Sequence, residues 1–508
     1  MTTKRLDMLL KKHANIALFS VLLIFIAIAT YNLDNIPADW FGDISIVNSY
    51  VISVLSGQFP FYFSTSGGPF YMYLISPFVS LFGISYLTYK YLSVACGVMG
   101  LVAIYLFSKQ VAPMRIAILT TLLTALSFWY LVWARLGNYN IISPLITALM
   151  MYFFIKYLEK HKLKWLALGI FCSCLGLFTY VGVFLLPIVL LVLVCWDMVI
   201  RNKRFDPKRV GLILLLYFPG FILFALLVLH DPAGFTNGYI GSKIVNNETL
   251  SAQKAIPRLL TNAFRTLLML HVEGDIVFRW NVSKAPLLDW LSGIFVIIGF
   301  IICVLKEKKY LPYLLLPLIL LPIPSILPGN PPVEIPSSSR TMAIIPFIFL
   351  FVAYGLDYSA RFIKTRFGIK WSIFLVVISI TIIGYLNLYN YFVRYPTQLP
   401  NENVSFGKEI ARYIDQQHTD IPVYLPSLGW GEWGQPSYNS IYYSLKYKKR
   451  NIINGLPECS HANTSAFVII FDPADIKQIN YMKTCFPTAT EQLHTKIGQR
   501  IFISMYKI

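Results

Sequence analysis

The sequence is poor in charged residues and in cysteine. Charged residues make up 13% of its 508 residues, and there are seven cysteines, whereas a soluble domain has about 25% charged residues. The scarcity of charge excludes an ordinary soluble enzyme, and the scarcity of cysteine excludes a small disulfide-stabilised scaffold. Apolar residues instead reach 56% and the mean hydropathy is +0.61, which excludes disorder and predicts a membrane protein.

The sequence also lacks the motifs of several soluble enzyme classes. It contains no Walker A sequence, no paired cysteines or histidines at metal-ligand spacing and no Gly-x-Ser-x-Gly turn. These motifs mark phosphate-binding loops, metal sites and serine hydrolases. Use of ATP or of a nucleotide sugar is therefore unsupported. No cofactor and no metal-binding residue is predicted, and a divalent metal requirement has no support in the sequence.

Basic residues give the chain a net charge of +19, and their placement indicates a membrane rather than a nucleic acid. A spanning helix needs about 20 mostly apolar residues. Such runs are centred on 14–31, 87–107, 114–132, 140–156, 164–180, 183–199, 210–229, 287–305, 310–327, 341–358 and 371–392. Clusters of Lys and Arg lie between them at 4–12, 109–115, 156–164, 201–209, 306–309 and 361–370.

The Pro-containing stretch 68–83 decides how these runs are counted. If it is an interfacial or re-entrant helix, all the basic clusters fall on one side, which is cytoplasmic by the positive-inside rule. We therefore predict a polytopic α-helical protein of the plasma membrane with eleven spans and a cytoplasmic N-terminus.

This topology divides the chain into a membrane module, residues 1–392, and an extracytoplasmic domain, residues 393–508. The outer loops of the module are 32–86, 230–286 and 328–340. The tail is helical in pattern at 406–416, 438–449 and 472–483, and extended at 421–425, 466–471, 491–497 and 500–506. This alternation predicts a small α/β domain with its own core. Cys459 and Cys485 both fall in it and can form a disulfide on the oxidising side, with two free thiols as the alternative.

The first outer loop holds the leading catalytic candidate, Asp43. Apolar residues recur at helical spacing over residues 46–55, so Asp43 stands at the start of an interfacial helix. A carboxylate there can cap the helix or, kept ionised by the helix dipole, can take a proton from a hydroxyl. The local sequence does not separate these roles. Asp34 and Asp39 of the same loop match no motif and are interpreted as solvated loop residues.

Four elements along the chain resemble, in the same order, elements of one group of membrane enzymes. They are FGDISIVNSYVISVLSGQFPF with GGPFYMYLISPFVSLFG, then SFWYLVWARLGNYNIISPL, then GDIVFRWNVSKAPLLDWLSGIFVIIGF, and finally SSSRTMAIIPFIFLFVAYGL. They are similar to the membrane glycosyltransferases of the GT-C fold. The families concerned are the dolichyl-phosphate-mannose-protein mannosyltransferase and aminoarabinose-transferase-like families (glycosyltransferase family 39 type). The resemblance covers roughly residues 14–400.

The resemblance implies transfer of a sugar from a polyprenyl-phosphate carrier to an acceptor on the outer face of the membrane, with Asp43 as general base. The sequence departs from the family in two places. Ile44 stands where the family usually has Glu, which puts a second carboxylate in doubt. Ser66, Gly67 and Gly68 stand where the aminoarabinose branch has a basic residue, which argues against that branch and its lipid A acceptor.

Arginines at the outer edge are the candidates for holding the donor phosphate, because a guanidinium binds phosphate through two parallel hydrogen bonds. The candidates are Arg340, Arg135 and Arg279, and the alternative for each is contact with lipid head groups. The late loop also carries Glu273 and Asp275. These two residues can order the site or bind the sugar or acceptor, or they can be turn residues only.

One stretch of the tail, SLGWGEWGQPSYNSIYY, is rich in aromatic residues: Trp430, Trp433, Tyr438, Tyr442 and Tyr443. Aromatic rings can stack on sugars, but an ordinary loop and core helix is the preferred interpretation.

The sequence thus predicts an inverting glycosyltransferase that acts on a hydroxyl of an envelope glycan, lipid or protein. Its expected partners are the lipid-linked donor, that acceptor and membrane lipids. A flippase for lipid-linked glycans is one alternative, although a flippase is expected to place ionisable residues near the middle of its spans. An inactive envelope-assembly partner with the same fold is the other, and Ile44 in place of Glu lends it some support.

Overall fold

The computed structural model describes residues 13–40, 42–64, 66–201, 207–239, 252–306, 309–328, 334–417, 421–426, 438–447, 450–459 and 466–507. The chain forms two compact units. The first consists of Met1–Tyr31, Tyr50–Leu81 and Lys90–Tyr395, and the second of Asn32–Ser49, Phe82–Tyr89 and Pro396–Ile508. The second unit therefore combines two segments of the first loop with the C-terminal tail.

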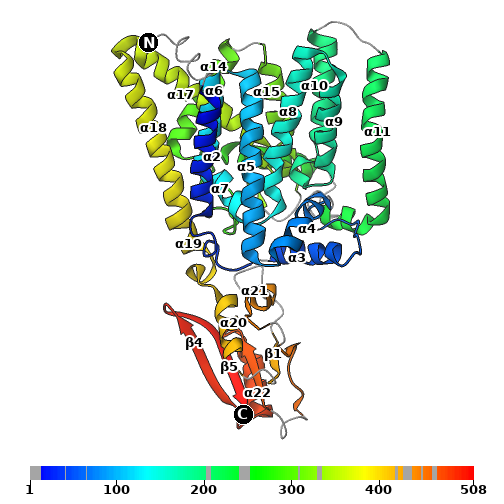
Figure 1. Ribbon diagram of the computed structural model, residues 1–508, viewed down its shortest axis with the longest axis vertical. Helices are drawn as coiled ribbons and strands as arrows, with labels where there is room; N and C mark the ends of the chain where they lie inside the picture. The colour runs from blue at the N-terminus through cyan, green and yellow to red at the C-terminus, as the bar shows by residue number, and fades with distance from the viewer. Residues whose placement is uncertain are drawn as a thin grey trace. The chain divides into compact units, whose positions relative to one another are not determined.

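Helices dominate the chain up to residue 398 (Figure 1). They are α2 (Ala14–Thr30), α3 (Gly42–Leu55), α4 (Phe70–Phe82), α5 (Tyr86–Val111), α6 (Met114–Leu126), α7 (Phe128–Arg135), α8 (Ile142–Lys160), α9 (Leu163–Leu177), α10 (Leu186–Trp196), α11 (Pro207–His230), α13 (Ala252–Leu268), α14 (Trp290–Lys306), α15 (Leu311–Leu320), α16 (Ile323–Ile326), α17 (Ile345–Phe367), α18 (Ile369–Tyr389) and α19 (Tyr395–Gln398).

The structure confirms part of the predicted set of spans. Within the described residues, six helices are long and apolar enough to cross a membrane, and α6 with α7, bent by 60°, adds a seventh if the pair is one span. These helices indicate a multi-pass membrane protein. The predicted count of eleven is not confirmed, because α2, α9, α14 and the pair α15–α16 fall among the shorter apolar helices.

Both helices predicted in the first loop are present. Asp43 lies in the first turn of α3, as the apolar spacing predicts. α4 has 13 residues and contains Pro77, so it is shorter than the roughly 20 residues of a spanning helix.

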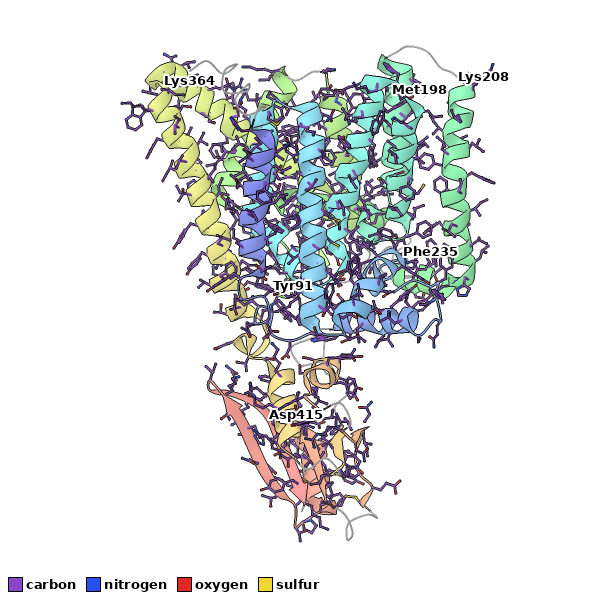
Figure 2. All side chains as sticks on the ribbon, in the orientation of Figure 1. Tyr91, Met198, Lys208, Phe235, Lys364 and Asp415 are labelled. Carbon is purple, nitrogen blue, oxygen red and sulfur yellow. A yellow bond between two sulfur atoms is a disulfide. The ribbon has the colours of Figure 1, made fainter. Side chains whose placement is uncertain are left out.

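Basic residues of the first unit gather at one end of its helices. Lys208, at the start of α11, and Lys364, in the last turn of α17, lie at this end, and Phe235 lies at the other (Figure 2). Tyr91, near the start of α5, lies toward the end of Phe235, so Lys109 in the last turn of α5 joins the basic end. This arrangement agrees with the predicted sidedness of these three clusters, while the orientation in the membrane stays a prediction.

The core of the first unit is built around α17, in which every residue from Ile345 to Asp357 is buried. A helix that is apolar and buried all round is surrounded by other helices. Its contact with α14 is especially close. A Cβ atom added to Gly355 would lie 2.0 Å from the carbonyl oxygen of Phe295, and one added to Gly299 would lie 1.8 Å from that of Phe351. The two backbones therefore touch, which only glycine allows.

The second unit contains a five-stranded sheet, as the α/β prediction for the tail requires. Its strands are β1 (Val423–Leu425), β2 (Ile452–Asn454), β3 (Phe467–Phe471), β4 (Thr490–Lys496) and β5 (Gln499–Lys507), in the order β2-β1-β3-β5-β4. β1 pairs in parallel with β2 and β3, whereas β5 pairs antiparallel with β3 and β4.

Helices cover both faces of this sheet. They are α20 (Phe406–Gln416), α21 (Tyr438–Ser444) and α22 (Ile476–Cys485). Alternate residues of β3 point to opposite faces. Val468 and Ile470 pack in the core of α20 and α21, whereas Phe467, Ile469 and Phe471 pack against α22. Cys459 and Cys485 form a disulfide beside the second of these cores.

Candidate active site

Asp275 lies in the loop between α13 and α14 and joins this loop to the segment that carries Arg340. Its buried carboxylate accepts hydrogen bonds from the N–H of Val277 (3.0 Å), the indole of Trp280 (2.8 Å), and the N–H (2.8 Å) and hydroxyl (3.0 Å) of Ser338. Burial raises the pKa of Asp275, and these hydrogen bonds partly offset the rise. With four donors around it, the Asp275 carboxylate links its loop to the segment of Ser338.

The residues just before Arg340 are also held by two helical elements of the membrane module. The indole of Trp129, in α7, donates to the carbonyl oxygen of Ser338 at 3.1 Å. The hydroxyl of Tyr180 lies 2.8 Å from that of Ser339. These contacts fix the backbone of the serine segment and therefore the direction in which Arg340 leaves it.

Arg340 is buried, with an exposed fraction of 3%. Its Nη2 forms an ion pair with Glu334. Its Nη1 is buried and has no hydrogen-bond partner among the described residues. Gly182 makes the close packing possible, because a Cβ there would lie 2.9 Å from the carbonyl oxygen of Arg340. Buried polar groups are rarely left unsatisfied, so Nη1 is suited to a ligand oxygen.

Arg135 is fully buried, and its guanidinium forms hydrogen bonds within the protein. Its Nη1 donates to the carbonyl oxygens of Ile28 (2.9 Å), Ala29 (3.0 Å) and Tyr31 (2.8 Å) at the end of α2, and its Nε donates to the Tyr391 hydroxyl at 2.8 Å. A guanidinium at a helix C-terminus satisfies free carbonyls and the helix dipole. This geometry favours a structural role for Arg135 over the predicted phosphate contact.

Arg279 and Glu273 differ in their surroundings. The guanidinium of Arg279 stacks over the Trp280 ring at 4.8 Å, and its carbonyl oxygen accepts a hydrogen bond from the Tyr395 hydroxyl. Arg279 is adjacent in sequence to Trp280, whose indole donates to Asp275. Glu273 is exposed and pairs with Lys284 at 3.5 Å. Such an exposed pair contributes little, which favours the interpretation of Glu273 as a turn residue.

The glycine segment of the first loop pairs with the chain around Tyr180. The N–H of Gly68 donates to Thr179 at 3.0 Å, and the N–H of Phe70 donates to Phe178 at 2.9 Å. A Cβ on Gly68 would lie 2.5 Å from the carbonyl oxygen of Phe178. The backbone approach therefore requires glycine where the aminoarabinose branch carries a longer, basic side chain.

An apolar groove of about 590 Å³ opens beside this pairing, between α4, α9 and α11. Its walls include Pro69, Phe70, Phe171, Phe178 and Leu223. An apolar groove of this size is suited to a hydrocarbon chain. The sequence analysis missed it because its walls come from helices far apart in the chain. The aromatic residues clustered around 61–73 were the one sequence signal that could have indicated the groove.

Asp43 belongs to the second unit and is half-buried there. On its helix, Ile44, Val47 and Asn48 are fully buried on one face, and the Asn48 side chain accepts a hydrogen bond from the Tyr89 hydroxyl at 2.8 Å. This face fixes α3 and leaves Asp43 beside the buried surface. Because Ile44 is a core side chain, its position cannot supply a second carboxylate.

The structure thus brings together Asp275, the segment of Arg340, and Trp280, which follows Arg279, in the first unit. Arg135 and Glu273 make separate contacts. In the described part of the chain, no group of three or more His, Cys, Asp or Glu residues could hold a metal ion. Of the aromatic stretch in the tail, Trp430 and Trp433 lie outside the described residues, whereas the three tyrosines belong to α21.

Comparison with known proteins supports the resemblance predicted from the sequence. Residues 66–225 match the family model of dolichyl-phosphate-mannose-protein mannosyltransferase. The structure of ArnT from Cupriavidus metallidurans bound to undecaprenyl phosphate aligns over 96% of this chain and 97% of its own, with a TM-score of 0.58 and 12% identity. The fold is that of the GT-C glycosyltransferases.

Archaeal enzymes show the same GT-C fold. The oligosaccharyltransferase of Archaeoglobus fulgidus in its apo form aligns over 86% of this chain and 64% of its own, with a TM-score of 0.52 and 12% identity. The same organism's AglB, in complex with an inhibitory peptide and a dolichol-phosphate, aligns over 91% of this chain and 70% of its own, with a TM-score of 0.52 and 12% identity. No curated protein matches the sequence.

Proposed function

We propose that this chain is a GT-C glycosyltransferase that moves a sugar from a polyprenyl-phosphate carrier to a hydroxyl acceptor on the outer face of the plasma membrane. The observation that carries the proposal is the combination of two features in the first unit. One is the buried guanidinium of Arg340, with its unsatisfied Nη1. The other is the apolar groove beside Phe178, two residues before the tyrosine that contacts the Arg340 segment.

These two features match the two parts of such a donor. A prenyl tail requires an apolar surface, and a phosphate requires a buried, planar donor such as a guanidinium. The structures that share this fold support the same chemistry, because ArnT was solved with undecaprenyl phosphate and AglB with a dolichol-phosphate. In this proposal Arg340 holds the donor phosphate, Arg279 assists it, and Arg135 and Asp275 position the surrounding segments.

The transfer step needs one base and one stabilised leaving group. The acceptor hydroxyl attacks the anomeric carbon, and the bond from that carbon to the phosphate oxygen breaks. Asp43 takes the hydroxyl proton, and the prenyl phosphate leaves as a dianion that Arg340 stabilises. Attack from the side opposite the leaving group inverts the anomeric carbon. The acceptor is a glycan, lipid or protein of the cell envelope.

The first test compares the wild type with Asp43→Asn, using a panel of radiolabelled polyprenyl-phosphate sugars and an envelope extract as acceptor. We expect transfer with the wild type and a loss of about 100-fold or more in the variant, the usual contribution of a general base. Glu491→Gln is the matched control, because Glu491 is a partly exposed carboxylate of β4 that pairs with Lys483 at 2.6 Å. Equal transfer by Asp43→Asn and the wild type would remove Asp43 from the mechanism.

Arg340→Gln tests the phosphate contact in the same assay. We expect its rate to fall by roughly 100-fold, since an electrostatic donor to the leaving group is lost. Arg394→Gln serves as its control, because Arg394 is an exposed arginine of the same unit that donates a hydrogen bond to Asn390 at 3.1 Å. If no donor of the panel yields labelled product with the wild type, the flippase or inactive-partner alternative replaces the proposal.

A further inference from the structure

The second unit contains a polar cleft that the proposed reaction does not use. We call it the α20–α21 cleft. It has a volume of about 590 Å³. It is lined by residues of α20, α21 and the turn after α21, and by Asp34, Ala38, Trp40, Ser85 and the first two residues of α5. Such a volume lies within the roughly 300–1,000 Å³ typical of small-ligand sites, enough for a few sugar rings.

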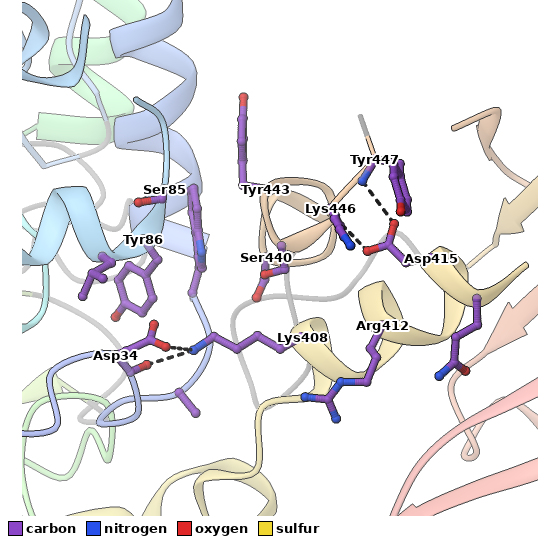
Figure 3. Close-up of a pocket in the computed structure, with 15 residues that line it drawn as sticks. Asp34, Ser85, Tyr86, Lys408, Arg412, Asp415, Ser440, Tyr443, Lys446 and Tyr447 are labelled. Carbon is purple, nitrogen blue, oxygen red and sulfur yellow. Dashed lines mark hydrogen bonds and ion pairs between the residues drawn. The ribbon is translucent and has the colours of Figure 1, made fainter. Parts of the chain in front are cut away.

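Positive charge dominates the lining of the cleft. Lys408 and Arg412 project from α20, and Lys446 follows α21 (Figure 3). Lys408 and Arg412 are four residues apart and therefore share one face of the helix. Two carboxylates, Asp34 and Asp415, also line the cleft. The formal charge of the lining is therefore positive.

The two carboxylates are already engaged. Asp415 accepts hydrogen bonds from the backbone N–H groups of Lys446 (2.7 Å) and Tyr447 (3.2 Å), so it fixes the turn after α21. Asp34 pairs with Lys408 at 2.8 Å. Neither carboxylate contacts Arg412 or the ammonium group of Lys446 in the described contacts.

Arg412 is an exposed cation of the cleft. Its side chain is 64% exposed, and its partner Glu409 is shared with Lys496. One carboxylate thus serves two cations, which leaves an excess of positive charge beside the cleft. The Lys446 ammonium lies 5.3 Å from the centre of the Tyr447 ring and forms no ion pair among the described residues.

Aromatic rings form the opposite wall. Trp40 stacks on Tyr443 with ring centres 5.5 Å apart and an interplanar angle of 10°, and it also contacts Tyr86 at 5.7 Å. Ser85 lines the same space. Flat aromatic surfaces and hydroxyl groups suit the apolar faces and hydroxyls of sugar rings, and guanidinium and ammonium groups suit carboxylate or phosphate.

We infer that the α20–α21 cleft binds an anionic saccharide, a glycan that bears carboxylate or phosphate groups, as part of the acceptor. This inference rests on the proposed function, because it names the acceptor class of that reaction. Arg412 and Lys446 contact the anionic groups, the exposed ring of Tyr447 contacts a sugar ring, and Asp34 with Asp415 keeps the lining in place.

Binding to the full-length protein in phosphatidylcholine nanodiscs tests the inference without a donor. The probes are trigalacturonate, a phosphorylated disaccharide and the neutral trisaccharide maltotriose. We expect at least one anionic probe to bind more tightly than maltotriose and to lose affinity as salt rises. Arg412→Gln and Lys446→Gln should each weaken that binding by roughly tenfold, the loss of one charge-assisted hydrogen bond, and Arg412→Lys should retain most of it.

Lys477→Gln is the matched control, because Lys477 is an exposed lysine of α22 outside the cleft. Binding as tight as the wild type in both cleft variants, equal binding of maltotriose, or no binding of either anionic probe overturns the inference. So does recruitment by anionic vesicles or acidic peptides alone.

Loss of transfer in Asp43→Asn with unchanged binding in Arg412→Gln overturns only the cleft. Loss of binding in Arg412→Gln with unchanged transfer in Asp43→Asn overturns only the proposed base.

Discussion

Asp39 holds the beginning of α20 across 368 residues of sequence. Its Oδ1 accepts hydrogen bonds from the N–H of Gly407 (3.1 Å) and from the hydroxyls of Ser405 (3.1 Å) and Ser440 (2.7 Å). Ser405 is the N-cap residue of α20, yet its side chain makes no capping bond within the helix. Asp39 supplies the cap instead. The interpretation of Asp39 as a solvated loop residue is therefore wrong.

Replacement of Asp39 by Ala should destabilise the second unit by about 2 kcal/mol, because three buried donors lose their acceptor. Thermal unfolding of the purified protein, followed by tryptophan fluorescence, measures this loss. Asp34→Ala is the control from the same loop. The Asp34 side chain is 55% exposed in its ion pair with Lys408, and exposed ion pairs contribute little to stability. Equal melting temperatures for Asp39→Ala and the wild type would contradict the capping role.

The stability contributed by Asp39 should also depend on pH. Burial raises its pKa above the usual 3.8, against the lowering effect of its hydrogen bonds. The folded state therefore holds the proton more tightly than the unfolded state. The contribution is complete below pH 3.8 and declines as the pH rises through the raised pKa. The difference in stability between the wild type and Asp39→Ala should widen as the pH falls through this window, and a constant difference would refute the assignment.

At the scale of elements, the close packing of α14 on α17 should tolerate no added atom. Gly355→Ala would place a Cβ 2.0 Å from a backbone oxygen of α14, and backbone cannot move aside as a side chain can. We expect the helices to separate and the protein to lose about 1–3 kcal/mol. Gly211→Ala in α11 is the control, because nothing lies within 4 Å of its Cβ position. Alanine there should be neutral or stabilising, as melting temperatures in detergent would show.

Elements set by local pattern were predictable from the sequence, and elements set by distant partners were not. The predicted helix 406–416 and the strand 466–471 correspond to α20 and β3, because their apolar spacing and buried run are local signals. The apolar run 114–132 gave no sign of the 60° bend between α6 and α7. There Ser127 caps α7, and the side chain of Asn387 accepts the N–H of Phe128 at 2.7 Å.

The candidate site follows the same rule. Arg340 and Asp275 were identifiable from motifs, but their connection through Ser338 required the folded chain. Arg135 fits a sequence motif, and only its contacts with α2 indicate a structural role. The short strand β2 (Ile452–Asn454) was missed because three residues carry no periodic signal. The predicted count of eleven spans is not confirmed, because several of the apolar runs correspond to helices of only 10–17 residues.

At the scale of the whole molecule, the disulfide between Cys459 and Cys485 ties α22 to the chain before β3 across 26 residues. Closing a loop of this length restricts the unfolded chain by about 3–4 kcal/mol. The double variant Cys459→Ser with Cys485→Ser should therefore unfold at a lower temperature than the wild type. Cys195→Ser, which removes an exposed free thiol, is the control. Equal electrophoretic mobility with and without reductant, and equal stability, would contradict a bridge formed outside the cytoplasm.

The capping of α20 by Asp39 has a consequence for the timing of synthesis. Asp39 leaves the ribosome 368 residues before Gly407, which amounts to roughly 20–70 s at 5–20 residues per second. Throughout that interval the first-loop segment has been made, but its partners in the tail have not. A ribosome that stops between the end of α18 and residue 396 leaves a chain whose membrane helices are complete but whose second unit cannot form. We expect cellular quality control to recognise such a chain by its unpaired first loop, although its membrane helices are complete.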